Sequence, residues 1–461
     1  FAGFAETEMS EDCLTLNVLV PRNKTPEDTP LPVMFWINGG GHQYGSGGGM
    51  YESQSLAAKG VILVSINYRL GLYGFLAHRE LAAEDPNGST GNYGMLDQIA
   101  ALQWVQAQIS SFGGDPDNVT IFGESAGGHS VGQLMASPLA TGLFHRAIAQ
   151  SGTGFQQFQA IDSSMENISG FEAGDQLAEM MGVSGKEEIQ ALRGMSTDEL
   201  AAAAVSPVLT STFHPQIDGY ALPQPTALAF AQGKQARVPL LVGSNADEGS
   251  VLYMFGMNPV DGGSSERPQS VDAWQQMLET DFGDQAADLS SHFAVDDDGD
   301  VIENAARLMG DSWFGRHAYY MAERHADVSP NTYLYFFERT PPATEQTIGA
   351  GHAQELFSVF KSRVPFWPTD ARDDELDEEM QGYWAQFAKS GYPNSQALPD
   401  WPAFDSVSRQ EMAFTNDRSF ARPVERRARY EAMKGQQSAR ESKALAILQE
   451  TKLEGFTDDP T

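Results

Sequence analysis

The chain has 461 residues, with 62 acidic against 29 basic side chains and a formal net charge of −33. This charge argues against nucleic acid and anionic membrane surfaces as partners, because both would repel the protein. Hydrophobic residues make up 41% of the chain, and no apolar run approaches the roughly 20 residues of a membrane span. We therefore expect one soluble domain over residues 1–461, cytoplasmic or secreted, as a monomer or homodimer.

The acidic residues are spread along the chain instead of forming one tail. Such a surface suits a protein that stays soluble in high salt, and it also suits an ordinary acidic bacterial enzyme. Cys13 is the single cysteine, so no internal disulfide can form and the redox compartment is undetermined. The sequence starts at Phe1 without a signal-peptide pattern, which is expected of a trimmed chain or a fragment.

The first third of the chain alternates strand and helix patterns. Strands are predicted at Asp12–Val20, Pro32–Ile37 and Val61–Tyr68, and a helix is predicted at Tyr93–Ser110. Buried strands that alternate with helices are typical of an α/β fold. We expect a mostly parallel central sheet with helices on both faces.

A glycine run, Asn38–His42, directly follows the second buried strand. A flexible turn would explain it, but glycines also let backbone N–H groups approach a substrate oxygen without a Cβ in the way. With a nucleophile elsewhere, Gly40 and Gly41 would supply half of an oxyanion hole.

That nucleophile is predicted at Ser125. A β-branched strand, Val119–Phe122, leads into Gly123-Glu124-Ser125-Ala126-Gly127 and then into small residues typical of a helix start. G-x-S-x-G in this strand–turn–helix context is typical of a nucleophile elbow, in which a strained serine sits at the tip and small flanking residues let strand and helix pass closely. The N–H of Ala126 would complete the oxyanion hole.

The middle of the chain, about residues 155–237, is richer in helices and loops, the better helices being Glu172–Met181 and Lys186–Leu192. We interpret it as a helical excursion that walls the pocket. Asn118 and Asn167 match the glycosylation pattern; Asn118 is discounted because it adjoins the elbow strand, and Asn167 is attributed to chance.

Two further strands, Val238–Val242 and Tyr333–Phe337, precede the remaining candidates for a catalytic triad. Asp247 and Glu248 follow the first of them, and His352 follows the second, in the chain order Ser, acid, His of this hydrolase type. His129 lies one helical turn after Ser125, where the helix would turn it away, so we assign it a structural role.

Metal chemistry is not expected. Asp296–Asp300 has its glycine in the wrong register for a calcium loop and is interpreted as a solvated acidic loop. We predict no metal and no cofactor. The helical tail after Pro423 contains Arg426, Arg427 and Arg429, interpreted as a solvated face.

Long motifs along the chain resemble the type B carboxylesterases, the α/β-hydrolase branch that includes cholinesterases. They are SEDCLTLNV at 10–18, NYRLGLYGF at 67–75, GNYGMLDQ at 91–98, FGGDPDNVTIFGESAGG at 112–128, AIAQSGT at 147–153 and WAQFAKSGYPN at 384–394. The resemblance implies an α/β-hydrolase fold and a serine ester hydrolase that uses an acyl-enzyme. Members usually carry tens of further residues before the first motif, including the partner of Cys13 when there is one.

The resemblance also implies residue roles. It assigns the triad acid to Glu248, with Asp247 as the rival, and the base to His352, which falls in the family's His-x-x-Glu-Leu pattern. Glu124 and Ser151 resemble residues that surround the triad. The resemblance further implies an ion pair between Glu11 and Arg69.

Departures from the family pattern concern the substrate. The family commonly has His or Tyr at position 38 and an aromatic or aliphatic residue at position 42, where this chain has Asn38 and His42. A polar His42 beside the pocket favours short- to medium-chain esters. Lipase, carbamate or thioester hydrolysis remain alternatives, as does a non-catalytic binding protein, although such proteins lose triad members.

Overall fold

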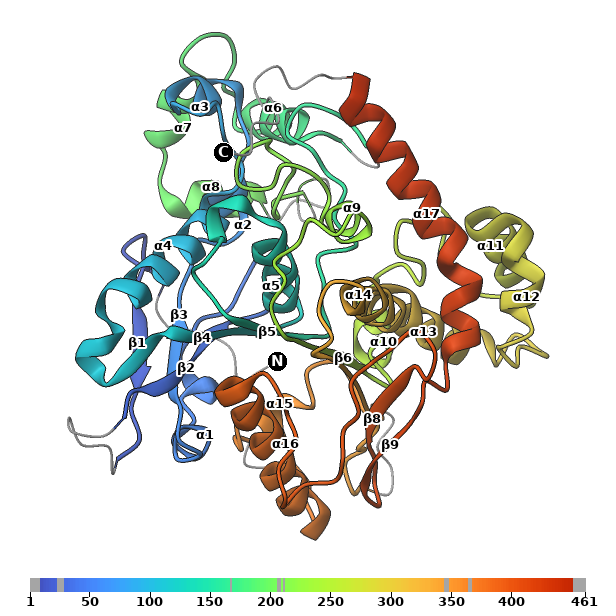
Figure 1. Cartoon of the computed structure of the whole chain (residues 1–461). Helices are drawn as coiled ribbons and strands as arrows, with labels where there is room; N and C mark the ends of the chain where they lie inside the picture. The colour runs from blue at the N-terminus through green and yellow to red at the C-terminus, as the bar shows by residue number, and fades with distance from the viewer. Residues whose placement is uncertain are drawn as a thin grey trace.

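The computed structural model describes residues 9–450 except 23–28, 166–167, 205–208, 210–211, 344–347 and 364–366. Its centre is a nine-stranded sheet in the order β1-β3-β2-β4-β5-β6-β7-β8-β9 (Figure 1). The strands are β1 Leu16–Leu19, β2 Leu31–Ile37, β3 Ile62–Ile66, β4 Gly114–Glu124, β5 Arg146–Gln150, β6 Leu240–Asn245, β7 Thr332–Phe337, β8 Gln410–Phe414 and β9 Ser419–Pro423. Only the edge pairs β1–β3 and β8–β9 are antiparallel. The predicted mostly parallel sheet is confirmed.

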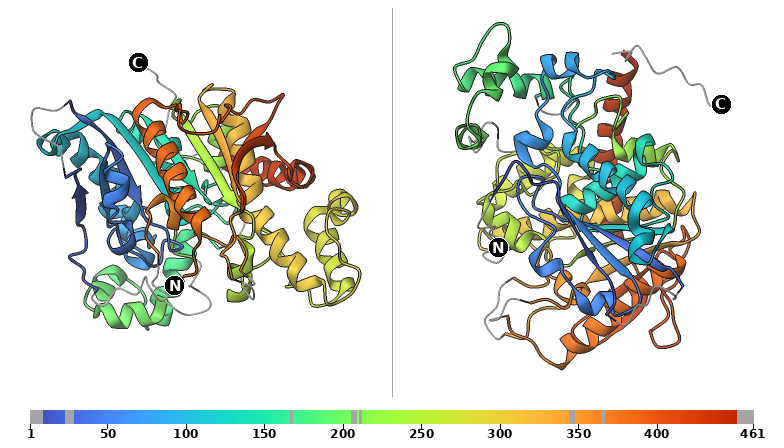
Figure 2. Two further views of the ribbon diagram at one scale, coloured as in Figure 1. Left: turned by 90° about the horizontal axis from the view of Figure 1, so that it is seen from below. Right: turned by 90° about the vertical axis from the view of Figure 1, so that its left-hand side faces the viewer.

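Helices cover both faces of this sheet (Figures 1 and 2). They are α1 Gln54–Ala57, α2 Gly71–Phe75, α3 Arg79–Glu84, α4 Tyr93–Gln108, α5 Ala126–Ala136, α6 Gly170–Met180, α7 Glu188–Arg193, α8 Thr197–Ala204, α9 Thr226–Ala231, α10 Gly249–Leu252, α11 Val271–Phe282, α12 Ala286–Ser290, α13 Val301–Gly310, α14 Arg316–Ala326, α15 Leu356–Val359, α16 Ala371–Ser390 and α17 Arg427–Glu450. In Figure 1, α4, α5 and α14 lie above the sheet and α15 and α16 lie below it.

The side chains of β2 show why the sheet is covered twice. Successive side chains of a strand point to opposite faces. Val33, Phe35 and Ile37 join the apolar core shared with α4 and α5, whereas Met34 and Trp36 join the core shared with α16. A strand that is apolar on both faces can be buried only between two helical layers, which fixes the three-layer architecture.

The helical excursion expected at about residues 155–237 contains α6, α7, α8 and α9. A second excursion, which the sequence did not predict, follows the loop after β6. Its helices α11, α12 and α13 pack around Trp274 and Met309, form a third apolar cluster with Met433 of α17, and project to one side in Figure 2. Among the helices described, none combines the length and apolarity needed to span a membrane.

Element boundaries differ from prediction where tertiary pairing extends a strand. β4 begins at Gly114, ahead of the predicted strand Val119–Phe122, because Leu31 of β2 pairs with Gly114. The edge strands β8 and β9 and the long helix α16 were not predicted. The tail helix was predicted and is α17.

Candidate functional site

The candidate residues meet at the carboxyl-terminal edge of the parallel strands, where α/β proteins bind ligands. Ser125 immediately follows β4, Ser151 follows β5 and Glu248 lies after β6. His352 lies in the loop after β7. The loops after β6 and β7 are held side by side by an isolated bridge between Asp247 and Gly351.

The elbow at Ser125 is strained, as its motif predicts. Ser125 has φ 56° and ψ −122°, in the positive-φ region that L-residues rarely adopt. A Cβ on Gly127 would lie 2.0 Å from the carbonyl oxygen of Ile37, and one on Gly123 would lie 2.5 Å from the Gly127 carbonyl carbon. Strand and helix therefore pass so closely that only glycine fits at both positions.

Glu248 holds the imidazole of His352. Its Oε2 atom lies 2.6 Å from His352 Nδ1, and its Oε1 atom accepts from the Ser151 hydroxyl at 2.6 Å and from the Asn245 N–H at 2.7 Å. Asp247, the rival acid, instead accepts from the Ala350 N–H at 2.8 Å. Of the two carboxylates, Glu248 is the one that contacts the imidazole.

Glu124 faces the other ring nitrogen. Its Oε1 atom lies 3.1 Å from His352 Nε2, yet this buried oxygen accepts no hydrogen bond. Burial opposes the imidazolium, but the carboxylates of Glu124 and Glu248 outweigh it and raise the pKa of His352 to about 9. Burial raises the pKa of Glu124 to about 8. A proton is therefore held strongly at this site.

The Ser125 hydroxyl makes no hydrogen bond to His352 in the part of the chain that the structure describes. Such catalytic contacts are often long without substrate and tighten when it binds. Nε2 is the atom that remains for this contact, because Nδ1–H donates to Glu248.

The glycine run after β2 presents backbone to the same edge. Gly40 and Gly41 have φ values of 105° and 64°, and their N–H groups donate to no acceptor among the described residues. Ala126 is the first residue of α5, so its N–H has no acceptor within the helix. A Cβ on Gly39 would lie 3.1 Å from the Ser125 Cβ, which places this loop against the elbow.

His42 does not line the site, contrary to the expectation from sequence. The residue is 1% exposed, its ring packs on Phe75 at 5.4 Å between centroids, and its Nε2 atom lies 3.2 Å from the Ser130 hydroxyl. The backbone of His42 adopts a positive φ of 59°. The argument that His42 makes the pocket more polar is therefore wrong.

Three polar residues that sequence reasoning did not single out surround the triad candidates. Glu355 is buried and accepts from Gln150 Nε2 at 3.0 Å and Asn245 Nδ2 at 2.7 Å. Burial, together with the charge of Glu248, raises the pKa of Glu355 to about 7. Glu355 could have been found, since it is the glutamate of the His-x-x-Glu-Leu pattern, whereas Gln150 and Asn245 carried no signal.

Phe314 is a further residue without a sequence signal. It belongs to a π-helical turn, η6 Asp311–Gly315, and its ring lies 4.8 Å from that of His352. π-Helical turns inside helices are frequent at functional sites. This turn brings an aromatic wall to the imidazole.

The expected ion pair between Glu11 and Arg69 is wrong. Arg69 pairs with Asp97 through two hydrogen bonds of 2.8 Å, and the exposed Glu11 accepts from the Thr197 hydroxyl instead. Arg69 pairs with Asp97 and not with Glu11 because α4 places the Asp97 carboxylate beside the guanidinium and also 3.0 Å from the Arg69 backbone N–H, which donates to it.

The arginines of the tail do not form a solvated face. Arg426 and Arg429 contact the fully buried Asp311 at 2.9 and 3.0 Å, and only Arg427 stays on the surface, 3.8 Å from Glu431. Because Asp311 comes from a helix 115 residues earlier in sequence than Arg426, the pairing could not be read locally.

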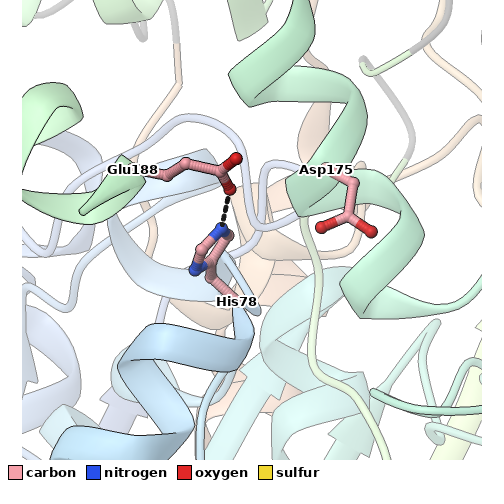
Figure 3. Close-up of side chains that lie close together, drawn as sticks. All are labelled: His78, Asp175 and Glu188. Carbon is pink, nitrogen blue, oxygen red and sulfur yellow. Dashed lines mark hydrogen bonds and ion pairs between the residues drawn. The ribbon is translucent and has the colours of Figure 1, made fainter. Parts of the chain in front are cut away.

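Within the described residues, one group of possible metal ligands comes together: His78, which caps the N-terminus of α3, Asp175 of α6 and Glu188 of α7 (Figure 3). His78 Nδ1 accepts from the Glu80 N–H at 3.1 Å, so Nε2 carries the proton, and it donates to Glu188 at 3.0 Å. Asp175 pairs with Arg79. A metal at Nε2 would displace the only ring proton, so these contacts fit a structural link between helices better than a metal centre.

The acidic loop Asp296–Asp300 and the glycosylation patterns at Asn118 and Asn167 were the other sequence patterns singled out. In the acidic loop, Asp300 accepts from the N–H groups of Asp296 and Asp297, and Asp298 accepts from the Val271 N–H. Asn118 accepts from Arg146, and Asn167 lies outside the described residues.

A strained serine, a Glu–His pair and a glycine loop at one edge of a parallel sheet define an α/β hydrolase. The model of the carboxylesterase family matches residues 2–434. The chain belongs to this family and is a carboxylic ester hydrolase. It is 37% identical over 413 residues to a fumonisin B1 esterase of Sphingopyxis macrogoltabida, covering 86% of this chain and 71% of that protein. It is 35% identical over 425 residues to a para-nitrobenzyl esterase of Bacillus subtilis strain 168, covering 88% and 80%. A solved para-nitrobenzyl esterase structure superposes with a TM-score of 0.75 at 30% identity, over 92% of this chain and 85% of that one.

Proposed function

We propose that this esterase acts through an acyl-enzyme on Ser125, with His352 as general base and Glu248 as the acid that orients it. The observation that carries the proposal is the 2.6 Å contact between Glu248 and His352 Nδ1, which leaves Nε2 for the strained serine, since Glu124 Oε1 lies 3.1 Å from Nε2 without a hydrogen bond to it. Glu248 is itself fixed by Ser151 and Asn245, so the imidazole has little freedom to turn.

In the first half of the reaction, the Ser125 oxygen bonds to the ester carbonyl carbon while its proton passes to His352 Nε2. The N–H groups of Gly40, Gly41 and Ala126 hold the resulting oxyanion. The carbon–oxygen bond to the alcohol then breaks, and the proton on Nε2 passes to the leaving alcohol. Water repeats the sequence on the acyl-enzyme and releases the acid.

The roles of Glu124 and Ser151 follow from their contacts. Ser151 donates to Glu248 and thereby orients the acid. Glu124 places a second carboxylate beside the imidazole, which stabilises the imidazolium formed after proton transfer.

The preference for short- to medium-chain esters stays a prediction. The polar side chain of His42 no longer supports it, since that side chain is buried. A chain-length series decides it. Activity that falls from acetate or butyrate toward palmitate supports the preference, and activity that rises with chain length would indicate a lipase.

The test is hydrolysis of p-nitrophenyl esters from acetate to palmitate by wild type and Ser125→Ala. We expect the variant to lose about 10⁴-fold or more in kcat. Ser110→Ala, which changes an exposed serine, should keep wild-type activity. A folded Ser125→Ala protein with wild-type kcat would overturn the assignment of the nucleophile.

A further inference from the structure

His129 lies next to the candidate nucleophile but has no role in the proposed mechanism. It stands one turn along α5, and its backbone N–H donates to the Ser125 carbonyl oxygen at 2.9 Å. Both residues are partly exposed, whereas their neighbours on α5 are mostly buried.

The hydrogen bonds of His129 fix its tautomer. Its Nδ1 atom accepts from the backbone N–H groups of Thr153 and Gly154, both at 3.0 Å. A ring nitrogen that accepts carries no proton, so the neutral imidazole has its proton on Nε2. Burial lowers the pKa of His129 to about 3, so the ring stays neutral in ordinary buffers. His129 is a neutral donor with a fixed orientation.

The Nε2–H group of His129 has no protein acceptor among the described residues. This nitrogen is not fully buried, so it reaches solvent. Thr153 and Gly154 follow Ser151, the residue that donates to Glu248, so the His129 ring lies on the loop after β5, at the same edge of the sheet as the triad candidates. An accessible donor at the edge of the sheet that carries Ser125 is available to a bound ester.

We propose that His129 is a specificity-determining residue whose Nε2–H donates to a hydrogen-bond acceptor carried by the ester substrate, beyond the scissile carbonyl. The inference rests on the proposed role of Ser125. The acceptor is a carbonyl, hydroxyl or carboxylate oxygen on the acyl or the alcohol part. Esters with such a group are favoured over apolar esters of the same shape, because the apolar analogue leaves the donor unpaired.

The test compares two matched pairs of esters. On the acyl side, p-nitrophenyl 4-oxopentanoate is compared with p-nitrophenyl 4-methylpentanoate, which replaces the ketone oxygen by a methyl group. On the alcohol side, 4-oxopentyl butyrate is compared with 4-methylpentyl butyrate. The readout is the ratio of kcat/KM within each pair.

His129→Phe removes the donor at similar volume, and His129→Gln keeps a side-chain N–H donor. We expect His129→Phe to lower the oxo-to-methyl ratio in one of the two pairs by about three- to tenfold, and His129→Gln to restore part of it. The pair that responds identifies which half of the substrate carries the acceptor. His145→Phe is the matched control, since His145 Nδ1 also accepts from a backbone N–H, of Val119 at 3.2 Å, but at the opposite edge of the sheet.

Equal losses on both members of each pair would mean that His129 only supports the backbone of Thr153 and Gly154, and would overturn the proposal. Ratios in His129→Phe that equal those of wild type would overturn it as well. Failure of the proposed function is distinguishable, because the Ser125→Ala variant would then keep wild-type activity toward all four esters.

Discussion

Three buried glutamates, Glu124, Glu248 and Glu355, lie around the imidazole of His352, and their charges raise the pKa of that imidazole. A general base works only when it is unprotonated. In the role proposed for His352, the proximity of these carboxylates therefore moves the unprotonated, base-competent form toward higher pH. The same charges stabilise the imidazolium that forms after proton transfer. Their cost is that the imidazole is already protonated in acid, where we expect the activity to fall.

Replacing Glu124 by Gln tests this balance. The change removes the carboxylate 3.1 Å from His352 Nε2, so the raised pKa of His352 should fall and the base should become available at lower pH. We expect the acidic limb of kcat/KM for p-nitrophenyl butyrate to move to lower pH by about one unit, measured from pH 5 to 10 at constant ionic strength.

Glu84→Gln makes the same change of charge on an exposed glutamate paired with Arg193 and should leave that limb where it is. A limb that stays in place in Glu124→Gln, or moves to higher pH, would contradict the assignment of Glu124 as the group that raises the pKa of His352.

At the scale of elements, the π-helical turn η6 connects the C-terminal helix to the site. Asp311 at its start is fully buried and holds Arg426 and Arg429. Arg426 also donates to the Ala246 carbonyl at 3.0 Å, two residues before Glu248. Phe314, in the same turn, packs on His352. The end of the chain thus stabilises both loops that carry the Glu–His pair.

Adjacent arginines provide the test of this connection. Arg426→Ala leaves the buried Asp311 carboxylate with one partner fewer and should lower the free energy of unfolding by about 2–4 kcal/mol, measured by urea denaturation. Arg427→Ala changes an exposed residue 3.8 Å from Glu431 and should alter it by less than about 0.5 kcal/mol. Equal effects of the two substitutions would show that the contacts of Asp311 do not stabilise the fold.

At the scale of the whole molecule, the net charge of −33 dominates the long-range electrostatics. Repulsion between like charges destabilises the compact state, and salt screens it. We expect the Tm to rise by several degrees as NaCl increases from about 0.01 to 0.3 M, over which the Debye length falls from about 30 Å to well under 10 Å.

The salt range of this rise separates the two interpretations of the acidic surface. An ordinary acidic enzyme should reach a plateau once screening is complete, whereas adaptation to a saline habitat predicts that Tm and activity continue to rise above about 1 M NaCl. A Tm that is flat or falling below 0.3 M would contradict self-repulsion as a destabilising factor.

The sequence by itself determined the mostly parallel sheet, the strained turn at Ser125 and the glycine loop at Gly40 and Gly41. It also predicted Glu248 and His352 as triad members from family motifs in the loops after β6 and β7, and the structure brings these two side chains into contact. These features depend on residues within a few positions of each other, whose backbone preferences and burial patterns are written locally.

Only the tertiary structure decided which side chains meet. It buried His42 against Phe75, paired Arg69 with Asp97 instead of Glu11, and directed Arg426 to Asp311. It also buried Glu355 beside the triad candidates. Polar groups that are buried on folding must find partners from whichever elements pack against them, and those elements lie far away in sequence. Local patterns therefore predict where a backbone turns, and packing selects the partner of each charge.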